Sequence, residues 1–315
     1  MVGNRGPGLG VWVRLSLYRG WVQLASAVVT NSWFTQRVTK GLPCLALNCY
    51  ACPLAVTACP IGSLQHFAAL KQVPLYILGV IGLAGVLGGR FACGWLCPFG
   101  WLQEWLHKVP VRKWRTRPRK RARWWVLLIA TLVYAAGGAA VAHLTKGTLW
   151  LLGLYLAVGW ALYALLGASQ LYSLIGLVIA LPLLFVEPWF CKLCPAGMLE
   201  GGIPQVLIDV RLRELVESFF WLKLGLLALF LAWMVVTRRP FCRWICPLGA
   251  LWAPLNRRST LQMAVDQEAC RHCGRCREVC PVDISIPDDP NVGACVRCMR
   301  CVGECPESCI TVRGL

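Results

Sequence analysis

The chain has 315 residues, of which 57% are hydrophobic and only 15% are charged. Soluble domains usually carry about 25% charged residues, so this composition indicates that lipid is the solvent for much of the chain. The formal net charge is +18, but the basic residues cluster between apolar segments, which argues against a nucleic-acid partner. The sequence therefore predicts a mostly α-helical, polytopic membrane protein.

Six apolar stretches approach the length of about 20 residues that a transmembrane helix requires. They are 20–36, 74–90, 124–143, 148–166, 171–188 and 219–237. Arg19 and Arg37 flank the first stretch, and their long side chains can reach the membrane interface; an interfacial helix is the alternative there. Several tryptophans are interpreted as further interface anchors. These are Trp95, Trp101, Trp105, Trp244 and Trp252.

A dense basic run orients these predicted spans. Between Arg112 and Arg123, eight of twelve residues are Lys or Arg, which places this loop on the cytoplasmic side. Counting spans from the loop puts 38–73 and 189–218 outside and everything after 237 inside. The sequence thus predicts a multi-pass protein of a prokaryotic cytoplasmic (inner) membrane, with both termini in the cytoplasm.

The membrane part contains four copies of the pattern C-P-x-G-x-L. They begin at Cys59, Cys97, Cys194 and Cys246, and each has another cysteine upstream. Proline suits the first turn of a helix, where it loses no hydrogen bond. A helix N-terminus would then direct its amides at an anionic thiolate group.

The predicted topology sorts the repeated cysteines into two sets. Two parallel repeats, about 20–97 and 171–246, are linked by helices at 124–166. The inner set is Cys93, Cys97, Cys242 and Cys246. The outer set is Cys49, Cys52, Cys59, Cys191 and Cys194. Each can supply the four thiolates of a [4Fe–4S] cluster; thiol–disulfide chemistry and plain packing are the alternatives. Cys44 and Cys309 fall outside the pattern and are interpreted as packing residues, although Cys44 is near enough to the outer set to replace a ligand.

After a transmembrane domain of residues 1–261, a small α+β domain of the bacterial-ferredoxin kind is predicted for 262–315. Its spacing, C-x2-C-x2-C-x3-C-P, occurs twice and is typical of a two-cluster [4Fe–4S] domain. A zinc ribbon would instead show paired C-x2-C units, without a fourth cysteine three residues on and before a proline. The fourth cysteine of each run crosses to the other cluster. One predicted set is Cys270, Cys273, Cys276 and Cys305. The other is Cys295, Cys298, Cys301 and Cys280.

Other cofactors have no matching pattern in the sequence. The chain has four histidines and no C-x-x-C-H run, so haem is not expected. It also has neither of the glycine-rich patterns that bind nucleotides. No catalytic residue is predicted beyond the cluster ligands.

The segments FACGWLCPFGWLQEW (91–105) and PFCRWICPLGAL (240–251) resemble the membrane elements of NapH-type polyferredoxins, which the NosR and CcoG types share. NCYACPLAVTACPIGSLQ (48–65) and PWFCKLCPAGMLEGGIP (188–204) resemble a subgroup of membrane 4Fe-4S binding proteins. The resemblance implies electron transfer between a cytoplasmic or quinone donor and an acceptor across or beyond the membrane. The resemblance also suggests the hypothesis that a separate flavoprotein is a redox partner of this chain.

Two functions fit this sequence. The first is an electron-transfer subunit, rather than a stand-alone enzyme, that passes electrons between the ferredoxin clusters and the outer cysteines. Its expected partners are membrane lipid, a redox protein (an external flavoprotein or a cytoplasmic donor) and a quinone. The second is a maturation or metal-handling factor that reduces copper or exchanges disulfides, because soft thiolates also select Cu(I).

Overall fold

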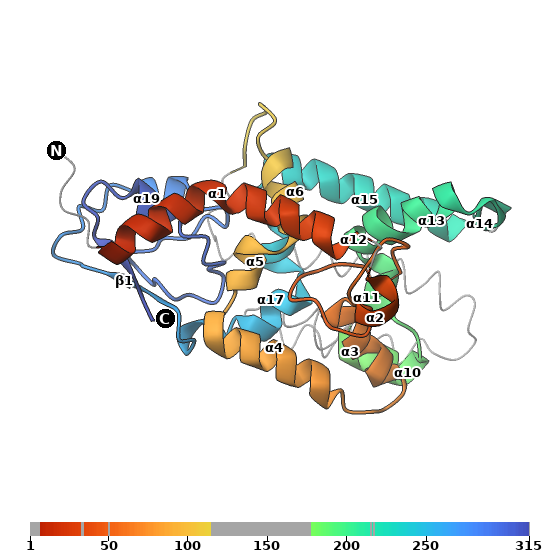
Figure 1. Cartoon of the computed structure of the whole chain (residues 1–315). Helices are drawn as coiled ribbons and strands as arrows, with labels where there is room; N and C mark the ends of the chain where they lie inside the picture. Colours follow the sequence, from red (N-terminus) through yellow and green to blue (C-terminus); the bar gives the residue numbers. More distant parts are fainter. Residues whose placement is uncertain are drawn as a thin grey trace.

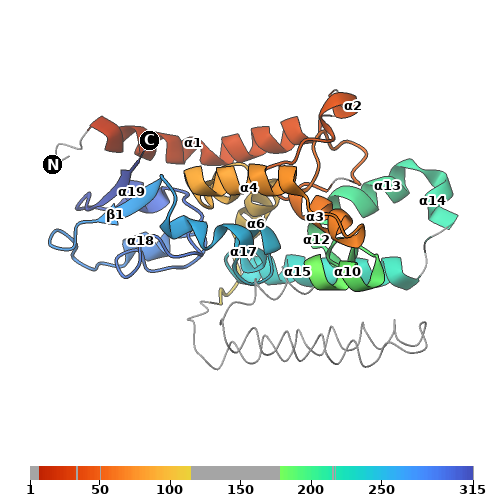
Figure 2. The same ribbon diagram turned by 90° about the horizontal axis from the view of Figure 1, so that it is seen from below.

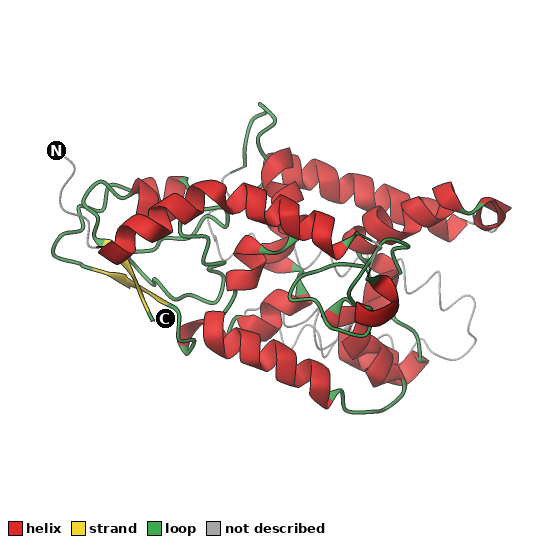
Figure 3. Ribbon diagram, in the orientation of Figure 1, coloured by secondary structure: helices red, strands yellow, loops and turns green. Residues whose placement is uncertain are grey.

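The computed structural model describes residues 7–32, 35–49, 51–114, 178–214, 216 and 218–314. These residues are mostly helical, with one small two-stranded sheet (Figure 3). The expected spans at 124–143 and 148–166, the first part of 171–188 and most of the basic run lie outside the described residues. The helical character and the small sheet of the predicted fold are thus confirmed.

The first half of the described chain forms helices joined by loops that carry several of the cysteines. These helices are α1 (Pro7–Thr30), α2 (Gln36–Thr39), α3 (Pro60–Ala69), α4 (Leu75–Gly88), α5 (Phe91–Trp95) and α6 (Pro98–Leu106). Helix α1 is long and lies across the molecule, where it packs against α5 and α6 (Figure 1).

The second half consists of short helices before and after one long helix, α15. Its elements are α10 (Leu181–Phe185), α11 (Trp189–Leu193), α12 (Pro195–Gly197), the π-helix η2 (Met198–Gly202), α13 (Ile203–Ile208), α14 (Val210–Glu214), α15 (Ser218–Val236), α16 (Pro240–Trp244), α17 (Pro247–Trp252) and the 3-10 turn η3 (Leu255–Arg257). Helix α15 packs against α6 and α16, so it contacts both cysteine-bearing halves.

The C-terminal part contains β1 (Gln262–Val265), α18 (Arg275–Glu278), α19 (Arg300–Glu304) and β2 (Ile310–Arg313). The two strands pair antiparallel, with Gln262 opposite Arg313 and Val265 opposite Ile310. This part occupies one end of the molecule and contacts α1 through α19, while α13 and α14 lie at the other end (Figures 1 and 2).

The cysteine that opens each C-P-x-G-x-L copy caps a helix. Cys59, Cys97, Cys194 and Cys246 are the N-caps of α3, α6, α12 and α17, with ψ angles from 113° to 124°. The following proline occupies the first helical position in every copy, where its fixed φ favours the helix and no hydrogen bond is lost. The prediction that the prolines begin helices is confirmed.

One helix of the described residues, Ser218–Val236, is long and apolar enough to cross a membrane; Leu75–Gly88 is a shorter apolar helix. Helix α1 differs from the expected span 20–36, because it begins at Pro7 and ends at Thr30. Arg19 therefore lies within the helix instead of at its edge. Its side chain is 1% exposed, so the prediction that it reaches the membrane interface was wrong.

Two of the tryptophans interpreted as interface anchors are buried in the protein. The Trp95 indole N–H donates to the Arg297 carbonyl at 3.0 Å, and the Trp252 indole N–H donates to the Ile81 carbonyl at 2.9 Å. A buried indole contributes a large apolar surface when its N–H has a partner. These two rings join segments far apart in the sequence, whereas Trp105 is exposed, as an anchor requires.

Candidate iron–sulfur cluster sites

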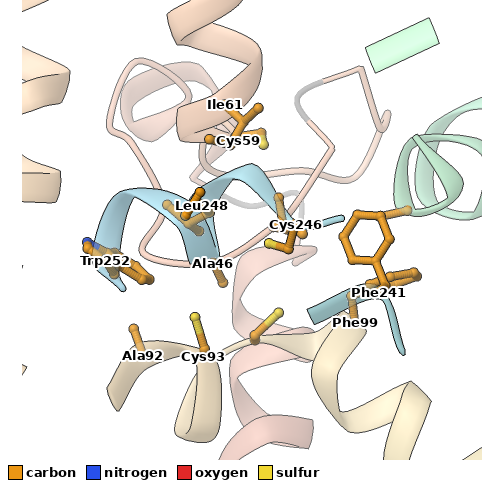
Figure 4. Close-up of a cluster of buried hydrophobic side chains, with 14 of the residues drawn as sticks. Ala46, Cys59, Ile61, Ala92, Cys93, Phe99, Phe241, Cys246, Leu248 and Trp252 are labelled. Atoms are coloured by element: carbon orange, nitrogen blue, oxygen red, sulfur yellow. The ribbon is translucent and has the colours of Figure 1, made fainter. Parts of the chain in front are cut away.

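The inner set of cysteines is brought together by two helix pairs. Cys93 lies in α5 and Cys97 caps α6, while Cys242 lies in α16 and Cys246 caps α17. All four are buried, and Cys97 and Cys246 each interact electrostatically with Cys93 and Cys242. Figure 4 shows Cys93 and Cys246 on facing ribbons, with their sulfur atoms directed at the space between them. Each half of the chain thus contributes two thiols to one buried site.

A glutamine from one half reaches a thiol of the other half. Gln103, six residues after Cys97, donates from Nε2 to Cys242 Sγ at 3.1 Å. Gln65, six residues after Cys59, donates in the same way to Cys191 Sγ at 3.0 Å. A hydrogen bond to the sulfur favours its thiolate form.

The sixth position after the capping cysteine was missed in the sequence analysis. It is occupied by Gln65, Gln103, Glu200 and Trp252. The signal was present, because two of the four copies continue as C-P-x-G-x-L-Q. Glu200 also crosses between halves, since its Oε2 accepts a hydrogen bond from the Cys49 amide at 2.8 Å. A polar residue at this position therefore ties the two repeats together at both cysteine sets.

Two buried arginines surround the inner set with positive charge. Arg239 donates from Nη1 to the Cys93 carbonyl at 3.0 Å. Arg90 donates from Nη2 to the Cys242 carbonyl at 2.9 Å and from Nη1 to the Gly293 carbonyl at 2.9 Å. Buried guanidinium groups offset the negative charge that a thiolate-ligated cluster brings. Gly100 leaves room for one of them, because a Cβ there would lie 3.2 Å from Arg239 Cζ.

Glu104, in α6, holds three guanidinium groups. It forms ion pairs with Arg19 of α1, with Arg239 at the start of α16 and with Arg300 of α19. Burial by itself raises the pKa of Glu104, but the three positive charges outweigh it and lower the pKa to about 2. One carboxylate thus links the first helix, both repeats and the C-terminal part.

The outer set is formed by the loop before α3 and by α11 and α12. Cys59 and Cys194 cap α3 and α12, and Cys191 lies in α11. Cys194 interacts electrostatically with Cys191, Cys59 and Cys49. Cys52 is buried beside this group and interacts with Cys49. Cys44 is half-buried, and its amide donates to the Ala58 carbonyl, next to Cys59.

The loop that carries the outer cysteines also reaches the inner set. The Leu47 amide forms a hydrogen bond with the Cys97 thiol. Ala46 lies between Cys93 and Cys246 in the close-up, and Cys59 belongs to the same cluster of buried side chains (Figure 4). The two cysteine sets therefore share one packed core.

The C-terminal cysteines follow the crossed pattern expected of a two-cluster domain. Cys280, Cys295, Cys298 and Cys301 line one cavity, so the last cysteine of the first run joins the first three of the second. Cys276 interacts electrostatically with Cys273 and Cys270. Cys309 contacts Cys305 on one side and interacts with Cys270 on the other. Cys305 therefore lies close to Cys270, Cys273 and Cys276. Cys273 is solvent-exposed.

The group of Cys280, Cys295, Cys298 and Cys301 lies against the inner set. A Cβ on Gly94, next to Cys93, would be 2.2 Å from the Val296 carbonyl oxygen and 3.5 Å from Cys298 Cα. Only a glycine permits such a close approach of two backbones. Arg239 adds to this contact, because it interacts electrostatically with Cys242 and Cys97 of the inner set and with Cys298.

Four buried thiols around one cavity fit a [4Fe–4S] cluster, which is held by four cysteine thiolates. Within the described ranges, no three Cys, His, Asp or Glu side chains converge on a single-ion site. Such a cluster supplies reversible one-electron transfer. At the inner set, Arg90 and Arg239 would offset the charge of a bound cluster, and Gln103 would donate a hydrogen bond to the Cys242 thiolate. At the outer set, Gln65 would donate in the same way to the Cys191 thiolate.

Known protein families match the same parts of the chain. A model described as a 4Fe-4S binding domain matches residues 71–117, 170–203 and 218–262, and a second model of that description matches 263–284. The first match includes all four inner cysteines and two outer ones, Cys191 and Cys194.

Curated relatives point to the same family. The chain is 34% identical over 110 residues to the ferredoxin-type protein NapH of Escherichia coli, covering 32% of this chain and 38% of that protein. The chain is a NapH-like polyferredoxin, and it binds [4Fe–4S] clusters.

Two longer matches cover more of the chain. It is 25% identical to the methylamine utilization ferredoxin-type protein MauN of Methylorubrum extorquens, over 72% of this chain and 58% of that protein. It is 23% identical to an uncharacterized protein of Methanocaldococcus jannaschii, over 80% of this chain and 85% of that protein. No solved structure matches the chain.

Proposed function

We propose that this ferredoxin-type electron-transfer protein is a transmembrane conduit that carries electrons between its C-terminal clusters and the outer cysteine set. The order of the sites carries the proposal. The C-terminal part lies at one end, α5 and α17 with the inner set follow, and α3, α11 and α12 with the outer set come next (Figures 1 and 2). Electrons can then move through neighbouring clusters in one direction along the molecule.

The contacts between neighbouring sites support this path. Cys93 and Cys298 belong to segments in direct contact at Gly94. The Leu47 amide links the outer loop to Cys97. A hydrocarbon core of about 30 Å would separate two sites at opposite membrane faces. The loop at 44–49 reduces that separation, because irregular backbone can enter a membrane where protein buries it.

Ligands are proposed from these groupings. The two C-terminal clusters use Cys270, Cys273, Cys276 and Cys305, and Cys280, Cys295, Cys298 and Cys301. The inner cluster uses Cys93, Cys97, Cys242 and Cys246. The outer cluster uses Cys49, Cys59, Cys191 and Cys194, which interact with one another, and Cys52 stands beside them.

The membrane placement belongs to the same proposal. Helix α15 is long and apolar enough to cross a membrane, which supports one of the six proposed spans, and α4 is a shorter apolar helix within a second. With the basic run in the cytoplasm, the C-terminal clusters are cytoplasmic and the outer set faces the other side. The proposed partners are a cytoplasmic electron donor, a quinone or an external flavoprotein.

The outer end also favours a second candidate function. Five cysteines and the half-buried side chain of Glu200 meet where a cluster needs only four thiolates. Soft thiolates bind Cu(I) as well as iron–sulfur clusters, so a metal-handling factor would use the same residues. Copper bound at these cysteines in purified protein, in place of iron, would favour this candidate.

Electron transfer across sealed vesicles tests the conduit. Full-length protein is reconstituted in phospholipid vesicles that enclose oxidised cytochrome c, and dithionite is added outside. We expect the enclosed cytochrome to be reduced several-fold faster than in protein-free vesicles, because the clusters carry electrons inward. The variant with Cys59→Ala and Cys194→Ala should lose this acceleration while it keeps the C-terminal cluster signals. Equal rates with wild-type protein and empty vesicles would rule the conduit out.

A further inference from the structure

Cys309 is a fifth thiol in one of the two C-terminal groups. It is 6% exposed, and its Sγ lies 3.3 Å from Cys305 Sγ. It also lies within hydrogen-bonding reach of Cys270. The cysteine spacing leaves Cys309 without a role, yet the fold places it against two proposed ligands of the same cluster.

The backbone around Cys309 holds it in this place. Cys305 ends α19, and the Ser308 amide donates to the Cys305 carbonyl at 3.2 Å, which closes a turn. Ser308 adopts a positive φ of 51°, and this directs the chain back toward Cys305. Cys309 then precedes β2, and its carbonyl accepts a hydrogen bond from the Asp266 amide at 2.9 Å. The sheet therefore fixes the position of the thiol.

The other C-terminal group provides a natural comparison. Cys305 and Cys280 both precede a proline and occupy matching positions in the two runs. Four residues after Cys305 the chain has Cys309, whereas four residues after Cys280 it has Ile284. The cavity lined by Cys280, Cys295, Cys298 and Cys301, the proposed ligands of the other cluster, has no fifth cysteine among the described residues.

We propose that Cys309 is a reserve ligand for the cluster held by Cys270, Cys273, Cys276 and Cys305, a proposal that rests on the ligand sets given above. In the exchange, the bond from iron to Cys305 sulfur breaks and a bond from iron to Cys309 sulfur forms. The proton of the Cys309 thiol passes to the Cys305 thiolate 3.3 Å away, so no electron is gained or lost. Before the exchange the Cys309 thiol donates a hydrogen bond to the Cys305 sulfur.

Alanine variants of the full-length protein test the exchange, because alanine cannot ligate iron. Cys305→Ala is expected to keep the iron content and the cluster spectrum of the wild type. The double variant with Cys305→Ala and Cys309→Ala is expected to lose one cluster, or about four iron atoms. Cys280→Ala is the matched control, and it should lose one cluster by itself.

A loss of iron in Cys305→Ala as large as in Cys280→Ala would overturn the reserve ligand. A Cys280→Ala protein that keeps all its iron would instead overturn the ligand assignment, so the two failures are distinguishable. Should Cys305→Ala fail to fold, Cys309→Ala keeps all four proposed ligands and tests the same idea. Its iron should pass to a chelator several-fold faster than in the wild type, and an unchanged rate would refute the proposal.

Discussion

Replacing Glu104 with glutamine is expected to lower the free energy of unfolding by about 3–5 kcal/mol, the usual cost of removing one partner of a buried ion pair. The change leaves Arg19 and Arg239 buried without their counter-charge, and both side chains are at most 1% exposed. Denaturant unfolding of the detergent-solubilised protein measures the effect. Because Glu104 joins α1, both repeats and α19, we also expect weaker attachment of the C-terminal part.

The same carboxylate predicts a dependence of stability on pH. The pKa of Glu104 is about 2 in the folded protein and about 4.3 in an unfolded chain. A group whose pKa is depressed by folding stabilises the protein fully above its unfolded pKa. This contribution is therefore lost as the pH falls from about 5 to about 2, and the Glu104→Gln protein should lack that part of the acid sensitivity.

An exposed ion pair provides the control for both measurements. Arg257 and Asp289 form a pair at 2.7 Å, with side chains that are 68% and 39% exposed. Exposed pairs contribute about 0–1 kcal/mol, so Asp289→Asn should change the unfolding free energy very little. A Glu104→Gln protein as stable as Asp289→Asn would show that the three arginines do not depend on this carboxylate.

Replacing Cys97 and Cys246 with serine is expected to remove one cluster and its paramagnetic signal. Each half of the chain loses its capping thiol, so the inner set retains only Cys93 and Cys242. The iron content should fall by about four atoms per chain, the content of one [4Fe–4S] cluster. Electron paramagnetic resonance of the reduced protein distinguishes this signal from those of the C-terminal clusters, which should stay.

Cys44→Ser is the matched control for that experiment. Cys44 is half-buried in the same packed core but takes no part in the proposed inner ligand set. Its replacement should leave the signal of the inner cluster in place. A spectrum unchanged by the double replacement of Cys97 and Cys246 would reject the inner site.

Local patterns predicted the features that depend on neighbouring residues. The C-P-x-G-x-L copies identified four helix starts, because proline at the first position and an extended cysteine before it are properties of a single turn. The two ferredoxin runs predict a C-terminal two-cluster domain in the same way. Their crossed pairing followed from spacing alone, and the cavity lined by Cys280 and the second run agrees with it.

Features that depend on distant residues were not predictable in this way. Arg19 resembled the polar edge of a span, but its partner Glu104 is 85 residues away. The loop around Leu47 resembled an external connection, yet it reaches Cys97. Cys309 resembled a packing residue until the turn at Ser308 placed it against Cys305. Apolar periodicity carries no information on the first two contacts, which the packing of separate segments creates, or on the local turn that brings Cys309 to Cys305.

Iron and acid-labile sulfide in anaerobically purified full-length protein test the central claim most directly. Two clusters in the C-terminal part and two in the repeats predict about 16 iron atoms per chain, at four for each [4Fe–4S] cluster. A content near 8 would confine the clusters to the C-terminal part. It would contradict the account, because the eight cysteines proposed for the inner and outer clusters would then serve thiol or copper chemistry instead.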